Sequence, residues 1–253
     1  AYAALGDTQR AIGYYEQRLE IAREIGDRRG KGAALGNLGL AYAALGDVQQ
    51  AIGYYEQALA IAREIGDRRG EGNALSNLGS AYLQFGDAWR AIGYYEQRLQ
   101  IARDIGDWRG EGTTLGNLGS AYAALGDTRR AIGYYEQALA IAHEIGNRHT
   151  EGDILSNLGS AYMALGDARH AIGYYEQALA ITREIGDQRA EGNAVGNLGS
   201  AYVALGDARR AIGYYEQTLA IAREIGIRGW ESTALDGLGN IHADLGNTWR
   251  AIE

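Results

Sequence analysis

The apolar residues of this chain recur at helical spacing and do not alternate as they would in a strand. Between Gly70 and Phe85 they stand at positions i, i+3, i+7 and i+10, and they are Leu75, Leu78, Tyr82 and Phe85. This spacing places them along one stripe of a helix. The pattern therefore predicts a helix over residues 70–85 with one exposed face.

The next segment, from Ala88 to Ile105, is apolar around about half of its circumference at ~100° per residue. Its apolar residues are Ala91, Ile92, Tyr94, Tyr95, Leu99, Ile101, Ala102 and Ile105. A helix covered to this extent must be buried on two sides. We expect it to pack between its own partner helix and the next pair of helices.

This pair of helices recurs every forty residues without an insertion or deletion. The segment Asn37-Leu38-Gly39 returns at Asn77, Asn117, Asn157 and Asn197, and Gly237-Leu238-Gly239 is a degraded sixth copy. A fixed period of about 20–50 residues is typical of a solenoid, in which each repeat buries its apolar face against its neighbours. We expect an all-α fold: one solenoid of stacked antiparallel helical hairpins over residues 1–253. It would hold about six repeats, truncated within a repeat at both ends, and would belong to a longer protein.

Glycine followed by an acidic residue or asparagine separates the predicted helices. The pairs begin at Gly26, Gly46, Gly66, Gly86, Gly106, Gly126, Gly146, Gly166, Gly186 and Gly206. Glycine takes the left-handed conformation that ends a helix, and aspartate caps the start of the next one. Glycines inside the helices, such as Gly70, Gly72 and Gly79, each cost about 1 kcal/mol relative to alanine. Stability must then come from the interfaces between helices, where Gly79 would let the second helix approach closely.

The composition narrows the classes of function. The net charge is −8, which disfavours binding to nucleic acid or to an anionic membrane. There is no cysteine, which rules out disulfides and thiolate metal sites, and no apolar run long enough to span a membrane. No signal peptide is visible. We expect a cytoplasmic protein without a cofactor.

Within one repeat, several residues resemble the signature of the tetratricopeptide repeat family. They are Leu75, Leu78, Gly79, Tyr82, Ala91, Tyr95 and the position of Arg98, which is alanine at Ala58, Ala138 and Ala178. The forty-residue variant is similar to the arrays of kinesin light chains, of Pins-type adaptors and of bacterial signalling proteins. The resemblance implies a right-handed superhelix whose concave side is lined by the first helix of each repeat and receives a peptide or protein segment.

The chain departs from the family at the positions that recognise charge. The arginine that polarity adaptors place early in the first helix is here Asn73, Thr113, Asp153 or Asn193. The basic residues that clamp a ligand carboxylate in some co-chaperones are not found at the matching positions. A chaperone tail or another acidic peptide is therefore not expected. We expect a neutral-to-basic segment, extended along the groove, with a helix laid in the groove as the alternative.

A column of asparagines is the candidate peptide-binding site. Asn77 lies more than 90° from the apolar stripe of its helix, so it faces away from the hairpin core. Its carboxamide matches the donor and acceptor of a peptide backbone. The candidate residues are Asn37, Asn77, Asn117, Asn157, Asn197, Asn73, Ser80, Ser120, Ser160 and Ser200, with Leu40 at the serine position of the first full repeat. The alternative is that these amides bond to one another or to neighbouring helices and only link the repeats.

The other residues that resemble known motifs do not predict a metal site, a nucleic-acid site or a catalytic site. His143-Glu144 begins like a zinc-protease motif, but Asn147 stands where a second histidine is needed, so no metal site is expected. Tyr94-Tyr95 and its copies fall on the buried half of their helix, which indicates core packing and not stacking of bases. Arg63, Arg68 and Arg69 are interpreted as partners of solvated ion pairs. No nucleophile and base are paired, so we expect no enzyme.

Three functions remain open. The first is a non-catalytic scaffold that binds a protein or peptide on the concave face. The second is a sensor or regulatory module of a larger bacterial signalling protein linked to an NTPase or a protease. The third is a structural array that associates end to end through its uncapped apolar ends.

Overall fold

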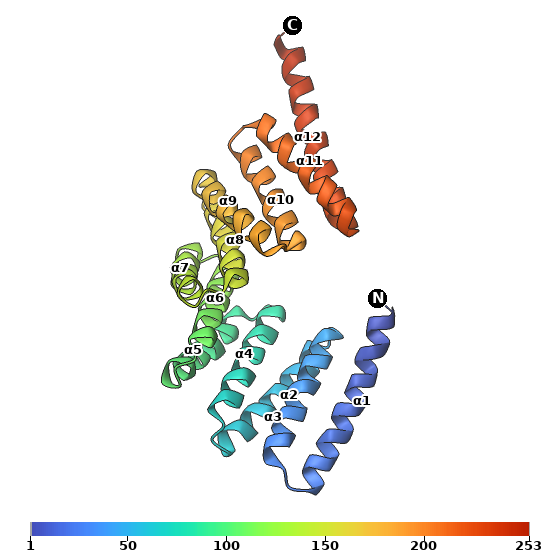
Figure 1. Cartoon of the computed structure of the whole chain (residues 1–253), viewed down its shortest axis with the longest axis vertical. Helices are drawn as coiled ribbons and strands as arrows, with labels where there is room; N and C mark the ends of the chain where they lie inside the picture. The colour runs from blue at the N-terminus through green and yellow to red at the C-terminus, as the bar shows by residue number, and fades with distance from the viewer. Residues whose placement is uncertain (1, 253) are drawn as a thin grey trace. The chain divides into compact units, whose positions relative to one another are not determined.

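The computed structural model of the chain describes the backbone of residues 2–252 and the side chains of residues 6–246. Over these residues the chain forms twelve α-helices and no strand, which confirms the predicted all-α class (Figure 1). The helices are α1 (Tyr2–Glu24), α2 (Arg28–Ala44), α3 (Val48–Glu64), α4 (Arg68–Gln84), α5 (Ala88–Asp104), α6 (Trp108–Ala124), α7 (Thr128–Glu144), α8 (Arg148–Ala164), α9 (Ala168–Ile185), α10 (Gln188–Ala204), α11 (Ala208–Ile225) and α12 (Arg228–Ile252).

The predicted glycine–aspartate turns join the helices. Gly46 has φ +83°, a left-handed conformation, and Asp47 accepts a hydrogen bond from the backbone N–H of Gln50. The same side-chain cap is made by Asp27, Asp67, Asp87, Asp107, Asn147, Asp167, Asp187 and Asp207. Because a capped turn of two or three residues leaves no slack, consecutive helices are held as antiparallel neighbours.

Helices α1 and α12 are longer than the others because they continue through a position where other repeats turn. They have 23 and 25 residues, against 17 or 18 for the other helices. α1 includes Gly6-Asp7 and α12 includes Gly246-Asn247. Neither Gly6 nor Gly246 is among the glycines with positive φ. A glycine of this kind therefore permits a turn but does not impose one.

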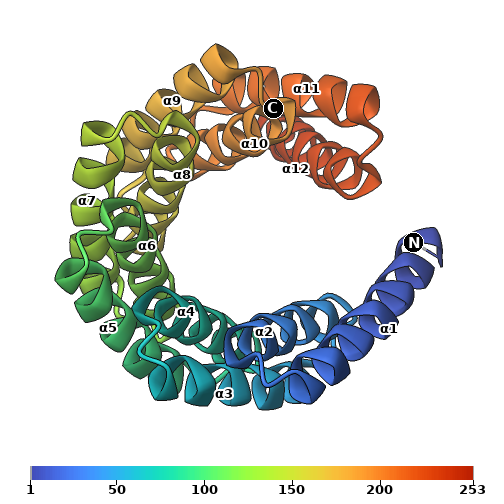
Figure 2. The same ribbon diagram turned by 60° about the horizontal axis from the view of Figure 1, so that its bottom comes forward.

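The backbone contacts divide the chain into two compact units, Ala1–Asp127 and Thr128–Glu253. Unit 1 contains α1 to α6 and unit 2 contains α7 to α12. Within each unit consecutive helices pack together, and each even-numbered helix also touches the next even-numbered one. Figure 2 shows that the even-numbered helices lie on the inner side of each unit's curve and the odd-numbered helices on the outer side. That residues 1–253 form one continuous solenoid stays a prediction.

The core of a repeat lies where a glycine of the even-numbered helix meets a tyrosine of the next helix. A Cβ atom placed on Gly79 would lie 2.4 Å from Cε1 of Tyr95, and the same closeness recurs between Gly39 and Tyr55 and between Gly159 and Tyr175. Leu75 and Leu78 of the predicted stripe are completely buried beside this contact. The close approach expected at Gly79 is confirmed.

Ion pairs join the ends of three of the hairpins. Arg28 at the start of α2 lies 2.6 Å from Glu64 at the end of α3, and Arg68 lies 2.9 Å from Asp104 in the next hairpin. Arg148 pairs with Glu184 in the same way. These exposed pairs each contribute only a few tenths of a kcal/mol, roughly.

Candidate functional site

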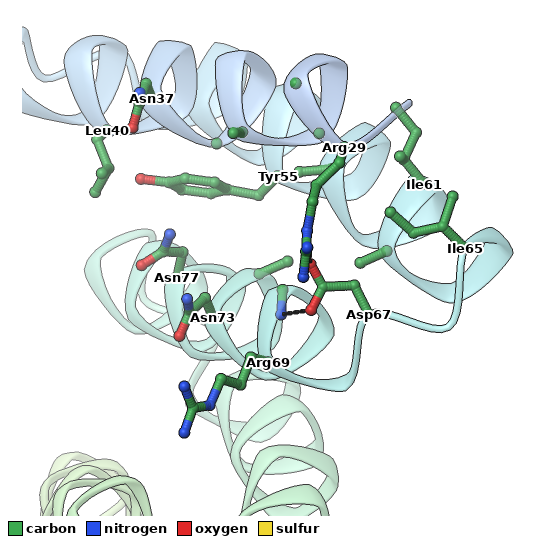
Figure 3. A pocket seen from close by; sticks show the side chains of 18 of the residues that line it. Arg29, Asn37, Leu40, Tyr55, Ile61, Ile65, Asp67, Arg69, Asn73 and Asn77 are labelled. Atoms are coloured by element: carbon green, nitrogen blue, oxygen red, sulfur yellow. Dashed lines mark hydrogen bonds and ion pairs between the residues drawn. The ribbon is translucent and has the colours of Figure 1, made fainter. Parts of the chain in front are cut away.

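A cavity of about 680 Å³ opens between α2 and α4 of unit 1, above α3 (Figure 3). Its walls hold mainly small residues, among them Gly32, Ala33, Gly36 and Ala74, and its floor is formed by Tyr55, Ala58, Ile61 and Ala62. The volume lies within the range of about 300–1,000 Å³ that is usual for ligand pockets.

Three of the predicted asparagines line this cavity. Asn37 projects from α2, and Asn73 and Asn77 project from α4 toward the same opening (Figure 3). None of the three carboxamides forms a hydrogen bond with a residue that the structure describes. The cavity therefore presents three amides whose donors and acceptors are free to bind a ligand.

The other asparagines of the column stand on the next even-numbered helices. Asn117 on α6 and Asn197 on α10 are half-buried, and Asn157 on α8 is exposed. They too form no hydrogen bond within the described residues. The alternative interpretation, in which the amides bond to one another and link the repeats, thus finds no support in these contacts. Their contact with a ligand stays a prediction.

The predicted serines are already engaged within the protein. The hydroxyl of Ser80 donates to the carbonyl of Ser76 and lies 3.1 Å from the hydroxyl of Tyr95. Ser160 and Ser200 form the same contacts, to Tyr175 and Tyr215. Ser120 donates to the carbonyl of Gly116. Ser80, Ser160 and Ser200 join the two helices of a hairpin, so any ligand contact would be an additional role.

Arginines that were not predicted as site residues stand in the same column as the asparagines. Arg69 precedes Asn73 and Asn77 by one and two turns of α4, and Figure 3 shows all three on one side of that helix. Arg29 holds the equivalent position on α2 and also lines the cavity. The sequence predicts solvated ion pairs for Arg63, Arg68 and Arg69. Arg63 and Arg68 do pair with Glu71, whereas no described acidic group lies within ion-pair distance of Arg69.

The acidic residues at the cavity are occupied. Asp67 caps the backbone N–H of Gly70 and lies 3.5 Å from the guanidinium of Arg29, while Asp27 caps Gly30. Of the arginines that line the cavity, Arg29 is thus paired with Asp67, whereas Arg18 and Arg69 form no ion pair with a described residue. The unpaired cations would attract an acidic group at this rim, in contrast to the neutral-to-basic segment expected from the sequence, which stays a prediction.

The next site along unit 1 has a different shape because Arg98 replaces Ala58. A smaller cavity of about 270 Å³ lies between α4 and α6, lined by Asn73, Arg98, Arg109 and Thr113 among others. The Arg98 side chain is only 8% exposed, and its Nη2 lies 2.5 Å from Asp107. This bond lowers the pKa of Asp107. Arg98 also lies across Gly72, where a Cβ would be 3.1 Å from its Cδ.

The column changes character in unit 2. His149 and Asp153 of α8 stand at the positions of Arg69 and Asn73, and the ring Nδ1 of His149 lies 3.2 Å from the Asp153 carboxylate. Arg189 on α10 restores an exposed cation one repeat later. The free positive charge is therefore concentrated on the even-numbered helices of unit 1.

Other kinds of site are not formed by the residues that the structure describes. No group of three or more His, Cys, Asp or Glu among them is placed to hold a metal ion. Within the same residues, no helix combines the length and the apolar character that crossing a membrane requires. Tyr95 is buried and Tyr94 stacks on Tyr82 with ring centroids 5.4 Å apart, which confirms core packing for this tyrosine pair.

Comparison with known proteins identifies the repeat. The tetratricopeptide repeat model matches residues 1–64, 30–104, 99–144, 150–224 and 193–253, which together include almost the whole chain. No curated protein sequence matches the chain.

Solved structures share the fold. BtubC (BKLC) from P. vanneervenii is 26% identical with a TM-score of 0.77, over 87% of this chain and 92% of that one. A signal transduction ATPase with numerous domains from Pyrococcus horikoshii, which has a tetratricopeptide repeat sensor, is 23% identical with a TM-score of 0.79, over 96% of this chain and 38% of that one. A Rap protein complexed with competence and sporulation factor is 17% identical with a TM-score of 0.70, over 94% and 74%.

Proposed function

The chain belongs to the tetratricopeptide repeat family, and on that premise we propose that it is a non-catalytic scaffold that binds a protein or peptide segment along its even-numbered helices. The observation that carries the proposal is the row of carboxamides without a protein partner at the cavity of unit 1, formed by Asn37, Asn73 and Asn77. Polar groups left free on one face of a groove can exchange their bound water for hydrogen bonds to a ligand.

An extended segment fits these groups better than a helical one. Each carboxamide offers a donor and an acceptor, which can bond the N–H and C=O of one peptide unit. The backbone groups of a helix are already bonded to each other, so a bound helix would leave the amides without that partner. The ligand is therefore an extended segment held mainly through its backbone.

The charged residues at the rim of the cavity indicate which charge the bound segment carries. Arg69 stands beside the amides without an ion pair, whereas Arg29 is paired with Asp67. An acidic segment would be attracted to this rim, and its affinity would fall as added salt screens the charges. The Rap protein, whose fold this chain resembles, was solved with a factor bound, which supports a binding role for this fold.

The test begins with selection of peptides from a random display library on the immobilised protein. Synthetic copies of the tightest peptide are then measured by fluorescence anisotropy against the wild type and against the double variant Asn73→Ala/Asn77→Ala. Two lost hydrogen bonds of about 1 kcal/mol each predict a loss of affinity of roughly tenfold or more.

The matched control is Gln57→Ala, which removes an exposed carboxamide from the outer helix α3. It should leave the affinity unchanged, and circular dichroism should show both variants folded. Equal affinity of the asparagine variant and the wild type, or the failure of any peptide to enrich, would overturn the proposal.

A second candidate function rests on one comparison. The repeat array of the Pyrococcus ATPase is named a sensor, and this chain spans 38% of that protein. We propose the sensor module of a larger signalling protein as the alternative to a free-standing scaffold. The sequence of the full gene tests it, because the absence of an adjoining NTPase, protease or kinase domain would remove the idea.

A further inference from the structure

The hydroxyl of Tyr55 differs from its copies in lacking a partner. Tyr95, Tyr175 and Tyr215 each lie within 3.2 Å of a serine hydroxyl on the facing helix. At the position of that serine α2 carries Leu40, which cannot form a hydrogen bond with Tyr55. No hydrogen bond from Tyr55 to any described residue is found.

This hydroxyl opens into the cavity. Tyr55 is only 2% exposed, yet it lines the cavity between α2 and α4. Figure 3 shows its oxygen directed toward the end of the cavity where Asn37, Leu40 and Asn77 lie. In the described part of the chain, Arg98 Nη1 is the one side-chain polar atom that is both sealed from solvent and without a partner. The Tyr55 oxygen is therefore reachable from the cavity.

A ligand that covers this hydroxyl without bonding it removes its contact with water at a cost in free energy, whereas a ligand group with a hydrogen-bonding atom avoids that cost. Burial raises the pKa of Tyr55, so the hydroxyl stays protonated and can both donate and accept. The side chains at the end of the cavity toward which its oxygen points, Asn37, Leu40 and Asn77, carry no charge. The fitting partner is thus an uncharged polar group.

The cavity exists because of a second difference between repeats. In the following repeat Arg98 stands at the position of Ala58, and its buried chain runs across Gly72 to Asp107. The corresponding space above Gly32 is bordered instead by Ile61 and is part of the larger cavity. Arg98 thus fills the space in its own repeat, whereas the corresponding space in the preceding repeat is left open.

We propose that the cavity between α2 and α4 is the anchor subsite of the groove: it takes one long side chain with an uncharged polar tip, such as glutamine or tyrosine, and the Tyr55 hydroxyl bonds that tip. Leu40 and Ala58 keep the hydroxyl unoccupied and the space empty. This inference rests on the proposed function, because it concerns the residue preference of the same bound segment.

The probe is the tightest peptide selected from the display library, synthesised with tyrosine and then with phenylalanine at its anchor position, which an alanine scan locates. A selected glutamine is compared with leucine in the same way. Wild-type protein should prefer the polar-tipped peptide by about tenfold, and Tyr55→Phe should bind both peptides alike. Tyr95→Phe is the matched control, because that hydroxyl is held by Ser80 outside the cavity, and it should keep the preference.

A second variant tests the open space. Ala58→Arg reproduces the plug of the next repeat, with Asp67 in reach as Asp107 is for Arg98, and should weaken the tightest peptide at least tenfold while the protein stays folded by circular dichroism. If Asn73→Ala/Asn77→Ala abolishes binding while Tyr55→Phe and Ala58→Arg change neither affinity nor preference, the anchor subsite is refuted and the scaffold function stands. If the asparagine variant binds normally, the proposed function itself fails.

Discussion

At the scale of single residues, Gly79 sets the distance between the helices of its hairpin. A methyl group there would lie 2.4 Å from Cε1 of Tyr95, whose ring is buried and whose hydroxyl is held by Ser80. The ring cannot swing away without losing that bond. We expect Gly79→Ala to lower the free energy of unfolding by about 2 kcal/mol, because overpacking outweighs the better helix propensity of alanine. Urea unfolding followed by circular dichroism measures this.

Gly93 provides the control for that substitution. It lies inside α5 with nothing within 4 Å of a Cβ atom placed on it. Gly93→Ala should raise the free energy of unfolding by up to about 1 kcal/mol through propensity alone. Equal effects of the two substitutions would show that the Gly79 contact does not govern the packing.

The ion pair between the buried Arg98 and the partly exposed Asp107 makes the stability of the protein depend on pH. The Arg98 guanidinium and the N–H of Gly110 hold the pKa of Asp107 below its ordinary value. The unfolded chain, with a carboxyl pKa near ~3.9, then binds more protons than the folded one. The stability from this pair is present above about pH 4 and is lost as the pH falls further. Arg98→Ala should flatten that decline, and urea unfolding at pH 7 and at pH 3 compares the two proteins; parallel losses would contradict the coupling.

At the scale of helices, a capping aspartate fixes where each helix begins. Asp87 accepts a hydrogen bond from the backbone N–H of Arg90 at 3.0 Å, and its second oxygen lies 3.2 Å from the Arg90 side chain. Asp87→Ala removes the cap of α5 and should lower the free energy of unfolding by about 1 kcal/mol. Asp87→Asn keeps an acceptor and should lose only a few tenths, roughly. Thermal unfolding of both variants gives the comparison, and equal losses would assign the effect to charge and not to the cap.

The bounds of a helix could be predicted from the sequence where the turn at its end joins two helices that pack against each other. The stripe containing Leu75 and Leu78 and the pair Gly86-Asp87 place α4 and α5 within two residues of their observed bounds. The same kind of pair at Gly6-Asp7 lies inside α1. A turn stabilises the fold only when the helices on both sides pack against each other, and a local sequence pair does not contain that information.

The candidate site was predictable in part for the same reason. The direction in which Asn77 points follows from helical geometry. Arg69 precedes Asn77 by two turns of the same helix, and this spacing would have placed it in the same column. The cavity does not follow from the repeat pattern, because it depends on which side chain crosses between neighbouring hairpins. Arg98 reaches Asp107 and fills its space, whereas Ala58 leaves its space empty. Only the packed structure shows that the difference between Arg98 and Ala58 changes the shape of the groove.

At the scale of the whole molecule, the end-to-end association considered from the sequence can now be tested at a defined surface. Ile61 in α3 is 6% exposed, whereas the corresponding Ile21 in α1 is 56% exposed. Tyr14 and Ile25 of α1 are also largely exposed. This apolar face of α1 is the surface through which we expect two copies of the polypeptide to associate.

The dependence of self-association on salt concentration distinguishes apolar contact from association through opposite charges. The chain carries a net charge of −8, so two copies repel each other at low ionic strength. Added salt screens the repulsion but leaves apolar contact intact, and self-association should therefore strengthen between about 0.01 and 0.15 M salt, where the screening length falls from about 30 to 8 Å. Sedimentation velocity over a range of protein concentrations measures it, and Ile21→Lys should keep the protein monomeric. Gln57→Lys introduces the same charge on the outer face of α3 and should associate as the wild type does. A protein that stays monomeric at high concentration and high salt would rule out association through this face.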